Sequence, residues 1–304
     1  DAPPHEASGR SLAHRLLISL RPGQWTKNLL VFAPLLFAVR LFDPASAAAA
    51  GGAFVIFCAL SGVVYLINDV ADRESDRLHP TKRLRPIAAG DLPVGVALGS
   101  AGVIGAAALA ASFTLGWRFG AIAAGYLLMQ AAYSASLKHV VIIDVLIVAI
   151  GFVLRAAGGA VAIDVVISNW LFVCTILGAL FIALAKRRHE LMLLADGAIS
   201  HRRILGEYSP YLLDQMISVV TASTLLAYIF YTISPETAEK FDTPWLGLTI
   251  PFALYGIFRY LYLVHQRDGG GSPADLLIND RPLLACVTLW IIAVVLIIYH
   301  PIVF

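Results

Sequence analysis

The sequence predicts an all-α, polytopic membrane protein with about nine transmembrane helices, whose polar loops gather on the cytoplasmic face. The composition supports this class, because hydrophobic residues make up 59% of the chain and charged residues only 14%. A soluble domain carries roughly a quarter charged residues. Since a helix needs about 20 mostly apolar residues to span a bilayer, a chain of 304 residues has room for many spans.

Nine apolar segments follow one another along the chain and define the predicted spans. They cover residues 28–41, 45–67, 92–115, 119–137, 140–163, 168–185, 211–233, 244–264 and 283–304. The first is the shortest and continues an amphipathic stretch. The series predicts a single membrane domain over residues 1–304, of which residues 1–20 form a flexible N-terminal segment.

Basic residues are distributed unevenly between the loops, and this predicts the orientation. Eighteen of the 22 Lys and Arg residues lie at the N-terminus or in and beside the loops after segments two, four, six and eight. The opposite face carries Arg40, Arg118 and Lys240, and Arg155 lies within a segment. Because cytoplasmic loops are enriched in Lys and Arg, we expect the basic face on the cytoplasmic side of the inner (plasma) membrane.

The total charge argues against nucleic-acid binding, and the spacing of the cysteines argues against disulfides and a cysteine metal site. The net charge of +2 is too small to favour nucleic-acid binding. Cys58, Cys174 and Cys286 lie inside apolar segments, at spacings that fit neither a disulfide framework nor a metal site. We interpret them as small hydrophobic residues packed between helices. The oligomeric state is not determined by the sequence, and a homo-oligomer stays open.

The second segment ends in an acidic motif with the sequence NDVADRESD, residues 68–76. Asn68, Asp72 and Asp76 stand four residues apart, so a continuous helix presents all three on one face. Such oxygen-bearing side chains suit Mg²⁺, which typically takes one or two carboxylates, waters and substrate phosphates. A solvated helix end paired with nearby arginines is the alternative. Because polar groups are costly at the end of an apolar span unless they are used, Asn68 and Asp69 favour the metal site.

A basic run that contains Lys82, Arg83 and Arg85 comes directly after the acidic motif. Guanidinium groups bind phosphate oxygens through paired hydrogen bonds. Anchoring to anionic lipid headgroups is the ordinary alternative for such a run. An acidic and a basic cluster within one short loop favour a site for a diphosphate with Mg²⁺.

The NDxxDxxxD pattern of residues 68–76, within nine predicted spans, resembles the first aspartate-rich motif of the UbiA-type intramembrane prenyltransferase superfamily. The resemblance extends over nearly the whole chain. It implies helices around a central cavity that cytoplasmic loops cap. It also implies that Mg²⁺, held by the motif, binds a substrate diphosphate there.

The loop after segment six departs from the pattern of aromatic prenyltransferases, which carry a second DxxxD motif at this point. Here residues 186–203 read KRRHELMLLADGAISHRR, with Glu190 as the acid at a similar place and Lys186 one turn earlier. The basic character of this loop disfavours an allylic diphosphate as the substrate.

Four stretches resemble instead the decaprenyl-phosphate phosphoribosyltransferases, a branch of the same superfamily. They are RPGQWTKNLL (21–30), HPTKRLRPIAAG (79–90), YSASLKHVVIIDV (133–145) and KRRHEL (186–191). This resemblance implies a soluble donor, phosphoribosyl diphosphate, and a polyprenyl (decaprenyl) phosphate acceptor that leads to cell-wall arabinan precursors. Both substrates are strongly anionic, which accounts for basic residues in place of the second acidic motif.

The resemblance implies a role for each motif in glycosyl transfer. Mg²⁺ on Asn68, Asp72 and Asp76 neutralises the diphosphate leaving group. Asp69 or Glu190 stabilises the positive charge that develops on the ribose ring. The substrate phosphates are expected on basic side chains, namely Lys82, Arg83, Arg85, Lys186 and Arg187.

Further candidate substrate-binding residues are Lys27, Asn28, Tyr133, Lys138, Asp144 and Arg155. For Lys27, Tyr133 and Lys138, interfacial anchoring is an equally ordinary interpretation. Asp144 and Arg155 fall on one face of segment five, about 16 Å apart along the helix axis, so they cannot pair directly. Because intramembrane ions face a bundle interior or a wet cavity, we expect both at a cavity, with Arg155 deeper.

Two other functions remain as alternatives. A prenyltransferase that joins a polyprenyl diphosphate to an aromatic acceptor would use the first motif but would need the second. A transporter or channel could line a path with Asp144 and Arg155. Against a transporter, inverted repeats and charged midplane pairs are not evident, and the polar groups crowd one face.

Overall fold

The chain is helical throughout the part that the structure, a computed structural model, describes. The described residues are 11–79, 81–194, 203–267 and 273–299, and no strand occurs among them. In chain order the helices are α1 Leu12–Ser19, η1 Pro22–Phe32, α2 Ala33–Phe37, α3 Pro44–Ala71, α4 Arg73–Leu78, η2 Lys82–Leu84, α5 Pro86–Ala89, α6 Val94–Thr114, α7 Trp117–Ala135, η3 Leu137–His139, α8 Ile143–Ala162, α9 Asn169–Leu194, η4 Arg203–Glu207, α10 Pro210–Ile233, α11 Pro235–Phe241, η5 Trp245–Thr249, α12 Ile250–Gln266, α13 Pro273–Asn279 and α14 Arg281–Tyr299.

Capping residues fix where several long helices begin. Asp43 accepts a hydrogen bond from the backbone N–H of Ser46 at 3.2 Å, and Pro44 follows at the first turn of α3. Ser209 caps α10 in the same way, with Pro210 at the first helical position. Both pairs satisfy an N–H group that the first turn leaves without a partner, and proline costs nothing there.

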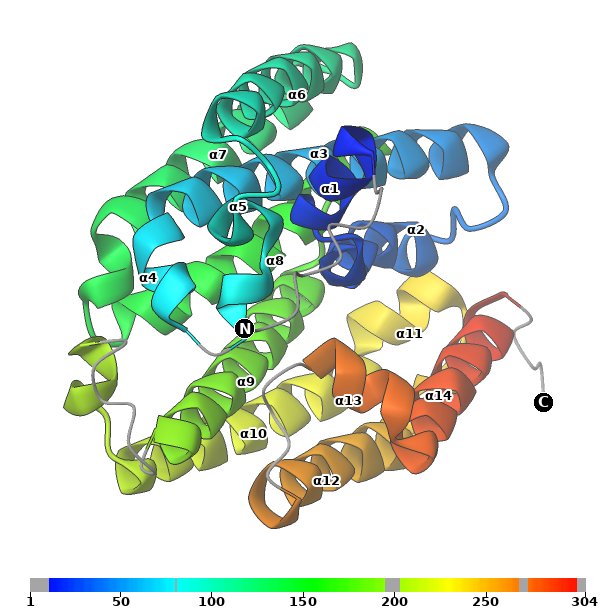
Figure 1. Cartoon of the computed structure of the whole chain (residues 1–304). Coiled ribbons are helices and arrows are strands. Elements are labelled where there is room, and N and C mark those ends of the chain that lie inside the picture. The colour runs from blue at the N-terminus through cyan, green and yellow to red at the C-terminus, as the bar shows by residue number, and fades with distance from the viewer. Residues whose placement is uncertain (1–10, 80, 195–202, 268–272, 300–304) are drawn as a thin grey trace.

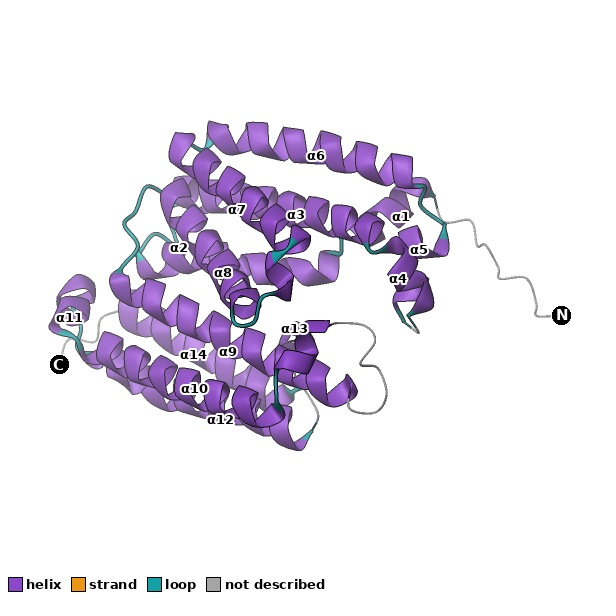
Figure 2. Ribbon diagram, turned by 90° about the vertical axis from the view of Figure 1, so that its left-hand side faces the viewer, coloured by secondary structure: helices purple, strands orange, loops and turns teal. Residues whose placement is uncertain are grey.

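The long helices lie side by side in two groups (Figure 1). Helices α3, α6 and α7 form one group, α9, α10, α12 and α14 form the other, and α8 lies between them. Helix α9 packs along both α8 and α10, and α3 packs along α6. The short helices α4, α5 and α13 gather at one end of the bundle, and α11 lies at the opposite end (Figure 2).

Within the described part of the chain, six helical stretches are long and apolar enough to cross a membrane, so the protein is an integral membrane protein. They are Pro44–Ala71, Val94–Thr114, Ile143–Ala162, Pro210–Ile233, Trp245–Gln266 and Arg281–Tyr299. Their outer surfaces are apolar, as the exposure of Val103, Val219 and Leu296 illustrates. Side chains of this kind face lipid at little cost, whereas they would be unusual in such numbers on a soluble protein.

The structure corrects the boundaries of the remaining predicted segments. Segment one is a 3₁₀ helix, η1, followed by the five-residue α2, and it begins before residue 28. Segment six continues to Leu194 as α9, well beyond residue 185, because the basic turn after it remains helical. Segment four corresponds to α7. Of the predicted flexible N-terminal segment, residues 1–10 lie outside the described part, whereas Leu12–Ser19 form helix α1.

Two glycines of α8 permit close packing: η1 packs against Gly159 and α3 packs against Gly158, so the first segment lies at the centre of the protein. A Cβ atom at Gly159 would lie 2.0 Å from the carbonyl oxygen of Val31, so any side chain would push the two helices apart. At Gly158 it would lie 2.6 Å from the ring of Phe57. Glycine here permits a backbone approach that no other residue allows.

Candidate active site

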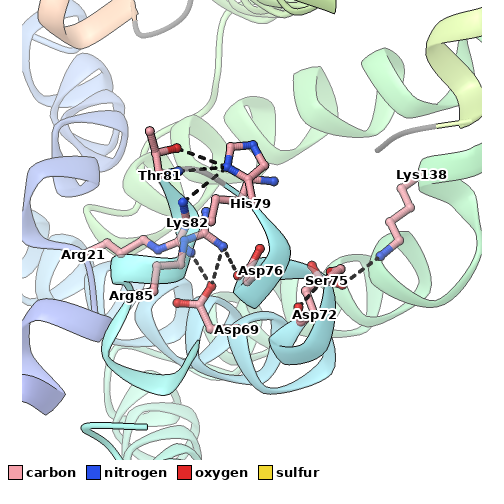
Figure 3. A network of polar contacts seen from close by, with 10 residues as sticks. All are labelled: Arg21, Asp69, Asp72, Ser75, Asp76, His79, Thr81, Lys82, Arg85 and Lys138. Atoms are coloured by element: carbon pink, nitrogen blue, oxygen red, sulfur yellow. Dashed lines mark hydrogen bonds and ion pairs between the residues drawn. The ribbon is translucent and has the colours of Figure 1, made fainter. Parts of the chain in front are cut away.

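Helix α3 ends at the acidic motif with a break in the backbone. Asp72 (φ −90°, ψ 6°) separates α3 from α4, although its N–H still donates to the Asn68 carbonyl at 2.8 Å. Helix α4 therefore turns, and Asp76 comes back toward Asp69 (Figure 3). Both carboxylates are buried and share one partner: Arg85 Nη1 lies 3.1 Å from Asp69 Oδ1 and 2.6 Å from Asp76 Oδ2.

Arg21 is a second cation on the same cluster. Its Nη2 donates to Asp69 Oδ1, and its guanidinium lies 4.6 Å from the centre of the Tyr65 ring. The backbone of Arg21 is left-handed, with φ 54°, which is uncommon for a residue with a side chain. The ion pair and the cation–π contact offset this strain and tie the start of η1 to the end of α3.

The three predicted metal ligands have different surroundings. Asn68 lines a central cavity, Asp72 is exposed with Lys138 Nζ 3.9 Å from its Oδ1, and Asp76 is held by Arg85. No group of three or more His, Cys, Asp and Glu side chains suited to a metal exists among the described residues. The oxygens of Asn68 and Asp72 nevertheless fit Mg²⁺, since this ion commonly uses one or two protein oxygens together with substrate phosphates.

A cavity of about 280 Å³ lies at the centre of the bundle, between the acidic motif and α9. Charged and polar side chains line it together with apolar ones. The lining residues are Gln24, Lys27, Ser61, Val64, Tyr65, Asn68, Tyr126, Gln130, Tyr133, Val145, Ile147, Val148, Phe152, Arg155, Ile182, Ala183, Lys186, Arg187 and Glu190.

Two cations, Lys27 and Arg155, form what we term the cavity floor. Arg155 is buried and donates from Nε to Asn28 Oδ1 (2.6 Å), from Nη1 to a carbonyl of its own helix and from Nη2 to the Tyr126 hydroxyl (2.9 Å). A guanidinium has five N–H donors, so these bonds leave two for a ligand. Among the described residues no carboxylate pairs with Lys27 or Arg155, and the floor therefore carries uncompensated positive charge.

Burial and positive neighbours act directly on Lys27. Lys27 lies in η1, before the six helical stretches that are long and apolar enough to cross a membrane. Burial, together with the charges of Arg155 and Arg21, lowers the pKa of its ammonium from 10.5 to about 8. A bound anion would reverse these effects, because opposite charge favours the protonated form.

Helix α9 contributes the opposite side of the cavity, which we term the cavity rim: Lys186, Arg187 and Glu190. Arg187 is buried, with Nη1 2.6 Å from Glu190 Oε2 and Nη2 2.5 Å from Asp144 Oδ2. Lys186 Nζ lies 3.9 Å from Glu190 Oε1 and is half exposed. In contrast to the floor, each rim cation has a carboxylate close by.

Tyr208 supports the rim through Asp144, the partner of Arg187. Its hydroxyl donates to Asp144 Oδ1 at 2.7 Å and accepts the backbone N–H of Ile142 at 2.7 Å. Ile142 has a left-handed φ of 69° at the start of α8. The hydroxyl thus links the segment after η4 to the turn before α8, and Asp144 carries this link to Arg187.

Some predicted site residues lie away from the cavity. Lys82 and Arg83 are exposed on η2, and their backbone N–H groups donate to His79 Nδ1 (3.3 Å) and to the His79 carbonyl (3.2 Å). Asp144 was expected to face the cavity, but it is fully buried behind the wall and binds Arg187 instead. Asn28 is also fully buried, where it connects Arg155 to Ser61 at 3.2 Å.

Other predicted residues do line the cavity, and the structure adds several. Lys27, Asn68, Tyr133, Arg155 and the three rim residues all contribute. Sequence reasoning missed the lining residues Gln24, Tyr65, Tyr126 and Gln130, as well as the supports Arg21 and Tyr208. A polar glutamine inside an apolar span was an available signal, because uncompensated polar groups are rare in a membrane.

Comparisons with known proteins agree with this architecture. The UbiA prenyltransferase family matches residues 29–279. A decaprenyl-phosphate phosphoribosyltransferase from Mycolicibacterium smegmatis is 36% identical, over 96% of this chain and 94% of the relative. Its counterpart from Corynebacterium glutamicum is 34% identical, over 95% and 88% of the two chains.

The fold comparison agrees. The solved structure of a UbiA homolog from Archaeoglobus fulgidus, bound to GPP and Mg²⁺, superimposes with a TM-score of 0.72 at 20% identity. It covers 92% of this chain and 99% of that one, and at this identity it supports the fold alone. The family match and the relatives extend over most of the sequence. The chain therefore belongs to the UbiA prenyltransferase family.

Proposed function

We propose that this protein transfers the 5-phosphoribosyl group from phosphoribosyl diphosphate to a polyprenyl phosphate and releases diphosphate, for the synthesis of cell-wall arabinan precursors. The curated relatives that match nearly its whole length carry this activity in their names. The observation that carries the proposal is the cavity floor, where Lys27 and Arg155 have no carboxylate partner among the described residues. Uncompensated cations in a cavity favour a multiply charged anion.

The floor and the rim bind different phosphates of the donor. The two remaining N–H donors of Arg155, together with Lys27, bind one phosphate of the donor, and Lys186 binds another. Charge-assisted hydrogen bonds of this kind contribute about 1.5–3 kcal/mol each. Arg187 is held in place by Asp144 and Glu190, so it presents a fixed guanidinium to the same ligand.

The transfer itself is a substitution at C1 of the ribose. The bond between C1 and the diphosphate oxygen breaks, and its electron pair leaves with the diphosphate. An oxygen of the lipid phosphate then forms the new bond to C1 from the opposite face. No strong general base is required, because a phosphate monoester is already ionised at neutral pH.

Positive charge develops on the ribose ring as the C1–O bond breaks. We assign its stabilisation to Glu190, which is the carboxylate among the residues that line the cavity. Asp69, the other candidate, is buried against Arg21 and Arg85 and is not among the residues that line the cavity. Mg²⁺ bound with the donor would neutralise charge on the leaving diphosphate, with Asn68 and Asp72 as its protein ligands.

The decisive test offers both donor classes to the same purified protein in nanodiscs. We expect radiolabelled phosphoribosyl diphosphate and polyprenyl phosphate to give a labelled lipid, with diphosphate released. Glu190→Gln should abolish the product, whereas Glu74→Gln, at an exposed position of α4, should not. A protein that joins a polyprenyl diphosphate to hydroxybenzoate and ignores the sugar donor would contradict the proposal.

We also propose nine membrane passes in the inner membrane, with the cavity opening on the cytoplasmic side, where a soluble donor is available. The bias of basic residues supports this orientation. In a background without natural cysteines, Arg83→Cys should resist an impermeant thiol reagent in intact cells, and Lys240→Cys should react. Both positions are exposed, and the opposite labelling pattern would reverse the orientation.

A further inference from the structure

A second cavity, of about 380 Å³, lies within the group formed by α9, α10, α12 and α14. No charged side chain occurs among its lining residues, and five of them are aromatic. The aromatic residues are Phe181, Tyr228, Phe252, Tyr260 and Trp290. We refer to it as the apolar cavity.

The polar atoms around the apolar cavity are mostly committed to one another. Trp290 Nε1 donates to the Tyr228 hydroxyl at 2.7 Å, and that hydroxyl contacts Thr249 Oγ1 at 2.6 Å. The Tyr260 hydroxyl is the exception, because it is buried and has no hydrogen-bond partner among the described residues. The cavity therefore presents hydrocarbon and aromatic surface, and none of its lining residues carries a charge.

Helix α9 separates this cavity from the polar one. Ile182 lines both cavities. Of its neighbours in sequence, Phe181 lines the apolar cavity and Ala183 lines the polar cavity. A molecule with a phosphate at one end and a hydrocarbon chain at the other could occupy both by passing Ile182. Hydrocarbon is disfavoured beside the charges of the floor and rim, whereas the apolar cavity suits it.

We infer that the apolar cavity seats part of the polyprenyl chain of the acceptor while its phosphate lies in the polar cavity. The inference rests on the proposed function. The five aromatic side chains of the lining suit a long hydrocarbon chain, because they remove apolar surface from polar surroundings. The polyprenyl chain passes α9 beside Ile182, with the phosphate on one side of this residue and the hydrocarbon on the other.

Filling the apolar cavity provides the kinetic test. A Cβ atom at Gly178 would meet no atom within 4 Å, so Gly178→Leu grows into the cavity without moving the backbone. We expect the KM for a long polyprenyl phosphate to rise tenfold or more. The KM for phosphoribosyl diphosphate, and that for a short-chain prenyl phosphate, should change less than twofold.

A matched control is available on a surface away from the cavity. Gly99 on α6 is exposed and likewise has no atom within 4 Å of an added Cβ, so Gly99→Leu should leave all KM values unchanged. Equal losses for long and short acceptors in Gly178→Leu would overturn the inference, because they would show that the cavity does not distinguish the chain.

A binding test that needs no turnover uses Trp290. The protein has five tryptophans, and the four others, Trp25, Trp117, Trp170 and Trp245, can be replaced by Phe. A polyprenyl phosphate with a brominated chain should then quench Trp290 saturably, and unlabelled polyprenyl phosphate should reverse this. Quenching by brominated phospholipid that polyprenyl phosphate cannot reverse would assign the cavity to a bilayer lipid and overturn the inference.

The two tests separate this inference from the proposed function. Saturable, reversible quenching without phosphoribosyl transfer would leave the apolar cavity as a polyprenyl site and reject the activity. Phosphoribosyl transfer without such quenching would retain the activity and reject the site.

Discussion

The floor and the rim of the polar cavity carry the same kinds of cation but neutralise them differently. At the rim, Arg187 has carboxylates on two sides, and Lys186 has one within 4 Å. At the floor, Arg155 is held by neutral groups, the Asn28 amide and the Tyr126 hydroxyl. A buried charge without an opposite charge is costly, so it persists where a ligand supplies that charge. The ion pairs thus hold the rim cations in place, whereas the floor cations are left to bind an anionic ligand.

The largest effect is expected at the floor. Arg155→Met removes at least two charge-assisted bonds to phosphate, each of about 1.5–3 kcal/mol, so kcat/KM should fall by about a hundredfold or more. Steady-state kinetics and equilibrium binding of phosphoribosyl diphosphate would measure the loss. Arg118→Met, at an exposed position of α7, is the control.

Folding must be separated from binding in this variant. Loss of Arg155 also leaves the buried Asn28 oxygen without its donor, which lowers the free energy of unfolding by about 1–3 kcal/mol. Arg155→Lys keeps the charge, and it should retain more donor affinity than Arg155→Met at a similar melting temperature. Donor affinity that is unchanged in a folded Arg155→Met protein would remove the contrast between floor and rim.

The acidic motif should divide into two kinds of residue. Asp72→Asn should lower kcat by about a hundredfold and raise the Mg²⁺ concentration needed for half-maximal activity, because an exposed metal ligand is lost. Asp76→Asn should instead lower the melting temperature, since Arg85 loses a buried partner at 2.6 Å. Mg²⁺ titrations and thermal melts of both proteins would test this, and identical profiles would argue against the division.

Tyr208→Phe should have a smaller effect, confined to the rim. It leaves the Ile142 N–H without an acceptor and frees Asp144, so the KM for the donor should rise about tenfold. Burial raises the pKa of Tyr208 to about 12, with the charge of Asp144 adding to this, so the effect should be constant between about pH 6 and 9.

The control for this variant is close in sequence. Tyr211 is exposed, and Tyr211→Phe should be neutral. If Tyr208→Phe lowered the melting temperature but left donor KM unchanged, Tyr208 would support the fold without positioning Arg187.

The smallest effect is a pH dependence at the floor. Lys27 is protonated below its pKa of about 8 and loses its charge above it, so donor affinity should be greatest below pH 8 and fall several-fold as pH rises through that value. Lys27→Arg keeps its charge and should flatten the profile. A decline that persists unchanged in Lys27→Arg would assign the titration to another group.

The architecture was largely predictable, because hydrophobic runs of sufficient length dictate spanning helices. All six helices that are long and apolar enough to span, among the described residues, begin within three residues of a predicted segment. The ends were less predictable where charge and helix coexist, as in α9, whose basic last turns continue the helix beyond the apolar run. Segment one was predicted, but its start before residue 28 and its 3₁₀ geometry were not, because η1 is positioned partly by its contact with Gly159.

Several of the predicted site residues line the cavity, whereas the side chains that hold them in place were not predicted. Spacing alone implied one helix face for Asn68, Asp72 and Asp76. The break at Asp72 instead turns α4, so Asp76 forms an ion pair with Arg85. Arg155 was expected deep in a cavity, and it lines one. Its partner Asn28 could not be derived from one sequence, since the two residues lie 127 positions apart.

That separation has a consequence for how the protein is made. Asn28 is synthesised long before Arg155. Until Arg155 is made, the Asn28 amide oxygen in η1 therefore lacks the guanidinium that donates to it in the folded protein. The pairs Asp144–Arg187 and Asp144–Tyr208, 43 and 64 positions apart, close later still. Membrane insertion of the helices therefore precedes assembly of the polar centre, and chains that stop before Tyr208 should stay protease-sensitive even when every earlier helix has been inserted.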